Sequence, residues 1–240
     1  MKNLLKHFGI IVITTIIAFS LTVCGGEDDD TKKPADDGLP SAGDGSINFS
    51  TAKTYQVMMY YDDYDNYGYK EFNGNATFTH SRGNALADYF AEGDYEVKIT
   101  NGTLSIKLGT PKPEALNDAS ELSNVYPGTT VTDGLKMLIV DMFSSENDES
   151  LYWYTSLTDP SGDFYGSSFS SFIYANKKGK IQFYEETEYE NYTFKVKLDM
   201  DLKLGWNIII GTQTTGTSPS YTTVTGKPRN DHKWIYSNDD

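Results

Sequence analysis

Strict alternation of apolar and polar residues from Tyr192 to Leu204 is the sequence feature that most constrains the fold. Each even-numbered position in this stretch carries an apolar side chain, and each odd-numbered position carries a polar one. A side-chain period of two predicts a β-strand with one face in a core and the other in water. The 13-residue stretch is longer than most strands, so we expect a bulge or a switch between sheets inside it. Gly205 then predicts a turn into a return strand over residues 206–211.

A second pattern predicts a β-hairpin centred on Asn101 and Gly102. Asn-Gly is the preferred pair for a tight two-residue turn, because both positions need a positive φ. The flanking segments 95–100 and 103–108 both alternate in hydropathy, so folding about the turn places six apolar side chains on one face. The expected cross-strand pairs are Ile99 with Leu104, Val97 with Ile106, and Tyr95 with Leu108.

The rest of the chain is rich in residues that favour strands, with 18 Tyr and 12 Phe. Turn signals separate the apolar segments at the spacing typical of a sandwich or barrel. We therefore predict an all-β fold, an antiparallel β-sandwich of the jelly-roll or immunoglobulin-like kind, with a closed β-barrel as the alternative. One short helix is expected over residues 113–122. Further strands are expected at 54–61, 72–80, 135–143, 151–157, 169–175, 180–184, 221–225 and 234–236.

The start of the chain differs in composition from the remainder. Lys2 and Lys6 precede a mostly apolar segment from Phe8 to Val23, which is the pattern of a secretory signal peptide. That segment is shorter than the roughly 20 apolar residues that a membrane-spanning helix needs. Residues 24–46 have little to bury, so we expect a flexible acidic linker there. The predicted organisation is a signal peptide at 1–23, the linker at 24–46 and a single β-sandwich domain at 47–240.

The sequence Leu21-Thr22-Val23-Cys24 resembles the lipobox of bacterial lipoproteins. In that family the signal peptide is removed just before the cysteine, so the resemblance implies a membrane anchor of palmitate-type acyl chains on Cys24. Acylation would also explain why the chain has a single cysteine. Gly25 differs from the aspartate that resembles an inner-membrane retention signal, so the resemblance implies an outer-membrane lipoprotein. An uncleaved N-terminal anchor is the alternative.

The acidic run Glu27–Asp30 does not decide which face of the outer membrane carries the protein. It is similar to the export tags of surface-exposed lipoproteins, and it is equally well described as a solvated tether. We therefore expect the protein in the cell envelope, on the periplasmic or the outer face of the outer membrane. The chain carries a net charge of −14, which repels phosphate backbones, so no nucleic-acid partner is expected.

Residues 62–71 gather several possible oxygen ligands for a cation. Counted from Asp63 as the first position of a calcium loop, Asp65 falls at the third. Tyr67 and Gly74 then occupy positions that calcium loops give to ligands. Solvated acidic loops without a cofactor are therefore the expectation, and calcium at Asp63 and Asp65 is the alternative.

No motif in the sequence meets the geometric requirements of a catalytic set, so no catalytic residue is assigned. Aromatic rings beside carboxylates are typical of sugar-binding surfaces and of protein interfaces. Tyr60, Tyr61, Tyr64, Tyr67 and Tyr69 lie among acidic residues in this way. Separately, the Tyr- and acid-rich segments 60–71 and 184–192 resemble each other in composition only and form no repeat. The candidate ligand-binding residues are Tyr152, Trp153, Tyr154, Tyr64 and Tyr67, with a place in the core as the alternative for each.

These observations predict a non-catalytic binding or interaction module with a glycan or a protein as its ligand. One alternative is an envelope structural or antigenic protein without a small ligand. The other is a carboxylate-dependent glycoside hydrolase, which would need two acidic side chains facing each other across a cleft.

Overall fold

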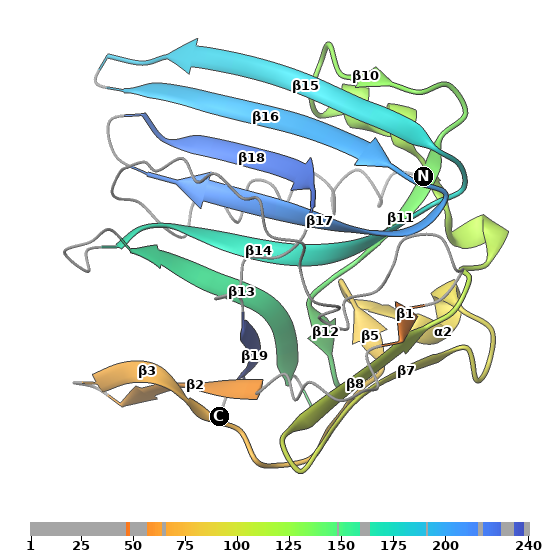
Figure 1. Cartoon of the computed structure of the whole chain (residues 1–240), viewed down its shortest axis with the longest axis vertical. Coiled ribbons are helices and arrows are strands. Elements are labelled where there is room, and N and C mark those ends of the chain that lie inside the picture. The colour runs from red at the N-terminus through yellow and green to blue at the C-terminus, as the bar shows by residue number, and fades with distance from the viewer. Residues whose placement is uncertain are drawn as a thin grey trace, which may run out of the picture.

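Two β-sheets form the part of the chain that the computed structural model describes (Figure 1). That part comprises residues 47–48, 57–63, 66–147, 149–158, 164–190, 192–215, 218–226 and 233–237. The smaller sheet has four strands in the order β1 (Ile47–Asn48), β8 (Thr103–Leu108), β7 (Tyr95–Thr100) and β4 (Ala76–Phe78). The expected signal peptide and linker lie outside the described residues.

Within the described residues, the larger sheet contains 15 strands. Its main path runs through β10 (Thr130–Val131), β15 (Gly179–Glu188), β16 (Thr193–Leu202), β18 (Ser220–Thr225), β17 (Gly205–Thr214), β14 (Phe164–Ala175), β13 (Ser150–Thr158), β12 (Phe143–Ser144), β5 (His80–Ser81) and β6 (Asn84–Ala85). The strands off this path are β2 (Val57–Asp63), β3 (Asn66–Glu71), β9 (Asn117–Asp118), β11 (Lys136–Val140) and β19 (Lys233–Ser237). Most of the described residues lie in strands, so the predicted all-β fold is confirmed. The sheets are not closed into a barrel, so the barrel alternative is wrong.

The central part of the alternating segment forms β16, and the expected burial holds only there, because Phe194 is half-buried while Tyr192 and Leu204 lie outside the strand and are exposed. Its apolar residues Val196, Leu198, Met200 and Leu202 are buried, and the residues between them are exposed or half-buried. The expected bulge or sheet switch is wrong, because the register with β15 runs unbroken along the whole of β16. The strand ends at Leu202, where the Asn207 side chain bonds to the backbone N–H and C=O of Lys203 and ends the alternation. A ten-residue strand is within the usual range and needs no interruption.

Strand β17 follows β16 in sequence but does not pair with it. Strand β18 lies between them, parallel to β16 and antiparallel to β17. A second parallel ladder joins β19 to β2, and the other ladders of the described residues are antiparallel. The expectation of a wholly antiparallel sheet therefore fails at these two ladders. Alternation along one strand specifies which face is buried, whereas the choice of neighbour depends on contacts distant in sequence.

Strands β7 and β8 form the predicted hairpin in the predicted register. Ile99 pairs with Leu104, Val97 with Ile106, and Tyr95 with Leu108. The two turn residues have the positive φ that the turn requires, 48° at Asn101 and 74° at Gly102. The Gly102 N–H also donates to the carbonyl oxygen of Gly74 at 3.0 Å, which ties the turn to the segment that precedes β4.

We expect Gly102→Ala to destabilise the protein more than Gly83→Ala. Both glycines have nearly the same positive φ, 74° and 75°, so the backbone strain is matched. A Cβ at Gly102 would lie 2.4 Å from the carbonyl oxygen of Phe72, whereas a Cβ at Gly83 would meet nothing within 4 Å. The expected losses in the free energy of unfolding are about 2–4 kcal/mol at Gly102 and about 1 kcal/mol at Gly83. Urea denaturation measures both, and equal losses would contradict the steric explanation.

The predicted helix over residues 113–122 is wrong. This segment forms two 3-10 turns, η1 (Pro113–Ala115) and η2 (Ala119–Asn124), with β9 between them. Pairing of β9 with β11 holds the intervening backbone extended, so one continuous helix cannot form. Asp118 caps η2 by accepting a hydrogen bond from the Ser120 N–H at 2.9 Å, which lowers the pKa of its carboxyl. The four-residue helix α2 (Leu86–Tyr89) also falls where the sequence predicts no helix.

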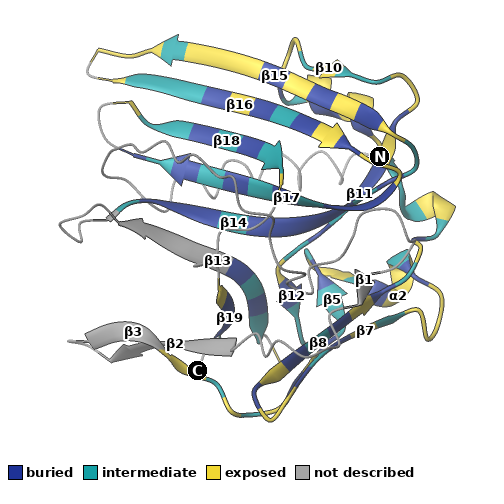
Figure 2. Ribbon diagram, in the orientation of Figure 1, coloured by how far each residue is buried: buried dark blue, intermediate teal, exposed yellow. Residues whose placement is uncertain are grey.

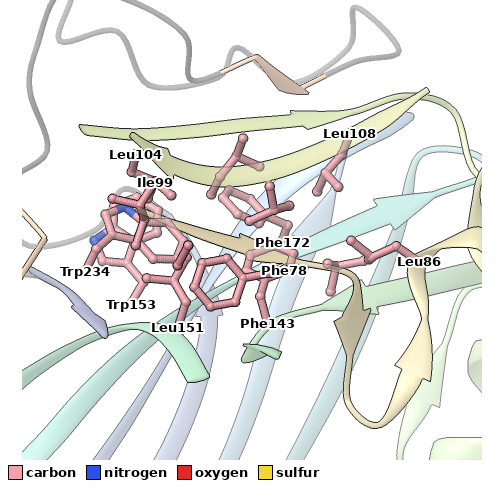
Figure 3. Packing of buried hydrophobic residues seen from close by; sticks show 14 of the residues in the cluster. Phe78, Leu86, Ile99, Leu104, Leu108, Phe143, Leu151, Trp153, Phe172 and Trp234 are labelled. Atoms are coloured by element: carbon pink, nitrogen blue, oxygen red, sulfur yellow. The ribbon is translucent and has the colours of Figure 1, made fainter. Parts of the chain in front are cut away.

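The main core lies between the smaller sheet and one face of the larger sheet (Figure 3). Ile99, Leu104 and Leu108 of the smaller sheet face Trp153, Phe172 and Trp234 of the larger one. The opposite face of the larger sheet is covered in part by η2, whose Ala119 and Leu122 pack with residues of β11, β14, β15, β16 and β17. Figure 2 shows the result, with β14 and β17 buried along much of their length.

Candidate functional site

The aromatic residues predicted on β13 take different positions. Trp153 is only 3% exposed, and its ring stacks on Trp234 with 5.1 Å between ring centroids. Trp153 therefore belongs to the core, and we do not retain it as a ligand-binding residue. Tyr152 is half-buried, and the alternation of the strand directs it to the face opposite Trp153. The side chain of Tyr154 lies outside the described part of the structure.

The remaining predicted residues near β2 and β3 are described only in part. Tyr67 is placed in β3 by its backbone, which pairs with Asp62, and Tyr64 lies outside the described residues. Asp63 is the last residue of β2, while its side chain and the whole of Asp65 are not described. The described residues contain no group of three or more His, Cys, Asp or Glu side chains placed to hold a metal ion. Because the side chains of Asp63 and Asp65 lie outside that description, calcium there stays an untested alternative.

The predicted lipid anchor on Cys24 also lies outside the described residues. Among the residues that the structure does describe, no helix is both long and apolar enough to cross a membrane. Lipidation of Cys24 and the outer-membrane location remain predictions from the sequence.

Exposed tyrosines cluster on the hairpin formed by β15 and β16, which we call the β15–β16 arm (residues 184–195). Tyr184, Tyr189 and Tyr192 are 61%, 52% and 42% exposed. They are three of the five large hydrophobic side chains that are strongly exposed in the described part of the chain. Figure 2 shows that this half of β15 is largely exposed, whereas the half near β10 alternates between buried and exposed residues.

The tip of the β15–β16 arm is held by backbone and ring contacts. The Tyr189 N–H donates to the Tyr192 carbonyl oxygen at 2.8 Å, which closes the hairpin beyond Glu188. The rings of Tyr189 and Tyr192 stack on each other with 4.7 Å between centroids and 20° between planes. Each ring fixes the orientation of the other, so the tip presents a preorganised aromatic surface to solvent.

Charged groups accompany the tyrosines of the β15–β16 arm. The Tyr184 hydroxyl donates to Glu186 Oε2 at 2.5 Å, and Lys195 Nζ lies 3.5 Å from Glu186 Oε1. The hydrogen bond from Tyr184 is the main cause that lowers the pKa of the Glu186 carboxyl, and the same bond raises the pKa of Tyr184. Glu186 is therefore ionised at neutral pH. The β15–β16 arm thus combines exposed rings with one carboxylate acceptor, Glu186, whose position is held by Tyr184 and Lys195.

A partly buried polar network that the sequence reasoning missed joins three parts of the larger sheet. Arg82, in the β5–β6 turn, forms a bidentate ion pair with Asp141. The side chains of Arg82 and Asp141 are 18% and 17% exposed. Ser171 on β14 donates to Asp141 Oδ2 at 3.2 Å, and the Ser81 hydroxyl donates to the Asp141 carbonyl oxygen at 2.6 Å. Burial by itself would lower the pKa of Arg82, but the Asp141 carboxylate outweighs it and raises that pKa.

This network is satisfied within itself, so we assign it a structural role. Arg82 and Asp141 are 59 positions apart, and no local pattern links them. The β15–β16 arm, in contrast, has a sequence signal in the Tyr- and acid-rich composition of residues 184–192.

No family model matches this chain, and neither does any curated protein or any solved structure. The function proposed below therefore depends on the chemistry of the chain's own residues.

Proposed function

We propose that the protein is a non-catalytic binding module, held at the outer membrane by lipid on Cys24, that engages its ligand through the β15–β16 arm. The observation that carries the proposal is the concentration of exposed tyrosines on this one hairpin, beside the Glu186 carboxylate. The lipobox-like sequence supports the anchoring, and the acidic linker supports a domain held away from the bilayer.

The chemistry of the β15–β16 arm suits a ligand with apolar faces and hydrogen-bond donors. Exposed tyrosine rings offer large apolar area, and each also carries a hydroxyl that can donate or accept. Tyrosines are enriched at binding surfaces because a rigid ring loses little conformational entropy on binding. Carboxylates such as Glu186 accept hydrogen bonds from sugar hydroxyls or from peptide and lysine N–H groups. A glycan or a protein segment that is neutral or basic therefore fits the proposed ligand.

Removal of the two tip rings should weaken ligand binding strongly. We expect Tyr189→Ala with Tyr192→Ala to weaken binding by at least about tenfold, because paired aromatic anchors carry much of the energy of such surfaces. The probes are a glycan array and an envelope-protein extract, applied to the full lipid-anchored chain on intact cells. Mass spectrometry of its N-terminal peptide reports the acylation of Cys24, and protease shaving reports which membrane face carries the domain.

The matched control replaces two exposed apolar residues elsewhere, Met142→Ser with Leu204→Ser. It removes apolar surface of similar exposure without touching the β15–β16 arm, so binding should stay unchanged. Equal loss in both double variants would contradict a specific role for the β15–β16 arm. An unacylated N-terminal peptide would contradict the anchoring.

A further inference from the structure

The outer edge of β15 has a backbone partner over only part of its length. Strand β10 pairs with β15 at two positions, Thr130 with Gln182 and Val131 with Ile181. From Phe183 to Glu188, no described residue pairs with β15 on the side away from β16. Figure 1 shows the same arrangement, with β10 beside the first part of β15 and the rest of the strand at the rim of the sheet.

Hydrogen bonds at both ends of β15 identify which backbone groups point outward. The Lys180 carbonyl oxygen accepts from the Thr132 N–H at 3.0 Å, so even-numbered residues direct their backbone groups away from β16. At the tip, Tyr189 donates to Tyr192, so odd-numbered residues direct theirs toward β16. Because the register is unbroken, Tyr184, Glu186 and Glu188 present their N–H and C=O groups to the rim.

We propose that this rim of β15 is a strand-addition site for an extended basic peptide segment of a partner protein. The inference deepens the proposed function, because it names the partner class for the same β15–β16 arm. An added strand would exchange backbone hydrogen bonds with Tyr184, Glu186 and Glu188, while its side chains alternate between the two faces of the sheet.

The negative charge along this edge of β15 favours a basic peptide segment as the added strand. Two of the three residues that present backbone groups to the rim are acidic, Glu186 and Glu188, and the chain as a whole is acidic. A segment with Lys or Arg opposite Glu186 and Glu188 would form cross-strand ion pairs, and an apolar residue would pack on Tyr184. A second copy of this chain fits poorly. Antiparallel self-pairing centred on Glu186 would place that carboxylate opposite its own copy, and like charges directly opposite are destabilising.

The test uses a synthetic ten-residue peptide that alternates Lys with Val and Thr, added to the purified full chain in detergent micelles. Hydrogen exchange measured by NMR should show the amides of Tyr184, Glu186 and Glu188 becoming protected. The amides of Glu185 and Thr187 bond to β16 already and should change little. Unprotected rim amides at saturating peptide would overturn the proposal.

Two controls separate strand addition from simple charge attraction. The same peptide with its rim-facing amides N-methylated keeps every charge, yet it should bind at least about tenfold more weakly, because it cannot form the ladder. On the protein, Glu186→Pro removes the charge and one outward N–H but no bond to β16, whereas Glu186→Gln removes the charge and keeps the N–H, so the difference between them reports the N–H. The proline variant should lose more affinity than the glutamine variant. Equal binding of the methylated peptide would overturn the proposal even if the proline variant failed to fold.

Other outcomes distinguish this inference from the proposed function. If Tyr189→Ala with Tyr192→Ala strongly weakens ligand binding while the rim amides never gain protection, the inference fails and the proposed function stands. If the rim amides become protected in a concentration-dependent dimer without peptide, the occupant is a second copy and the inference is overturned. Protection by the basic peptide, but not by a peptide with Glu in place of Lys, supports the inference as stated.

Discussion

Trp206→Ala is expected to lower the free energy of unfolding by about 3–5 kcal/mol, in the range of the largest core truncations. The Trp206 ring is fully buried and packs between Phe90 and Tyr174, with centroids 6.2 Å and 5.4 Å away. Its Nε1–H donates to the carbonyl oxygen of Gly109 at 3.1 Å, just after β8. Trp206 belongs to β17, so this residue connects the larger sheet with the smaller one. The substitution would leave both a cavity and a carbonyl oxygen without its donor.

Two further variants are compared with Trp206→Ala, one that removes the hydrogen-bond donor and one exposed control. Trp206→Phe keeps most of the ring and removes the donor, so we expect a loss of about 1–2 kcal/mol. Leu204→Ala lies two positions away but is exposed, and its effect should stay within about 0.5 kcal/mol. Chemical denaturation with a shared slope measures all three. If Trp206→Ala cost no more than Leu204→Ala, the ring would not be part of the junction between the sheets.

Arg82→Ala is expected to lower the free energy of unfolding by about 2–4 kcal/mol, because it leaves the partly buried Asp141 carboxylate without its cation. The remaining protein donor to that carboxylate among the described side chains is the Ser171 hydroxyl at 3.2 Å. Arg82→Lys keeps the positive charge but cannot form the bidentate pair, so we expect an intermediate loss in the free energy of unfolding. The β5–β6 turn, which the ion pair holds against the start of β12, should exchange its amide protons faster in the alanine variant.

The control is an ion pair between exposed side chains. Lys98 Nζ lies 2.9 Å from Glu96 Oε1, but both side chains are well exposed. Lys98→Ala should change the free energy of unfolding by no more than about 0.5 kcal/mol, because water screens such pairs. A double-mutant cycle of Arg82→Ala with Asp141→Ala then gives the coupling energy of the partly buried pair. A coupling below about 0.5 kcal/mol, the range usual for exposed ion pairs, would contradict the stabilising role assigned to the network.

Local patterns in the sequence predicted those features of the fold that depend on neighbouring residues. The alternation that forms β16 and the Asn101-Gly102 turn both act within a few positions, so burial and hairpin register follow from them. The helix predicted over residues 113–122 failed for the opposite reason. Pairing of Asn117 and Asp118 with β11, a contact across the fold, overrides the local preference for a helix.

The candidate site shows the same division. Trp153 and Tyr152 alternate in the sequence, so one of them had to face the core, but only the packing of Trp234 and Phe172 shows that it is Trp153. The Tyr- and acid-rich composition of residues 184–192 is visible in the sequence. Its exposure depends on β15 lying at the rim of the sheet, and strand order does not follow from composition.

By itself, the sequence determined that this chain is all-β, which face of β16 is buried, and how β7 pairs with β8. Side-chain period and turn chemistry are local, so one strand or one turn contains the whole signal. Only the tertiary structure decided that β18 lies between β16 and β17, that Arg82 meets Asp141, and that no described strand pairs with the outer edge of β15 beyond Gln182. These features depend on which distant segments compete best for the same backbone and side-chain partners, and that competition is resolved only when the whole chain packs.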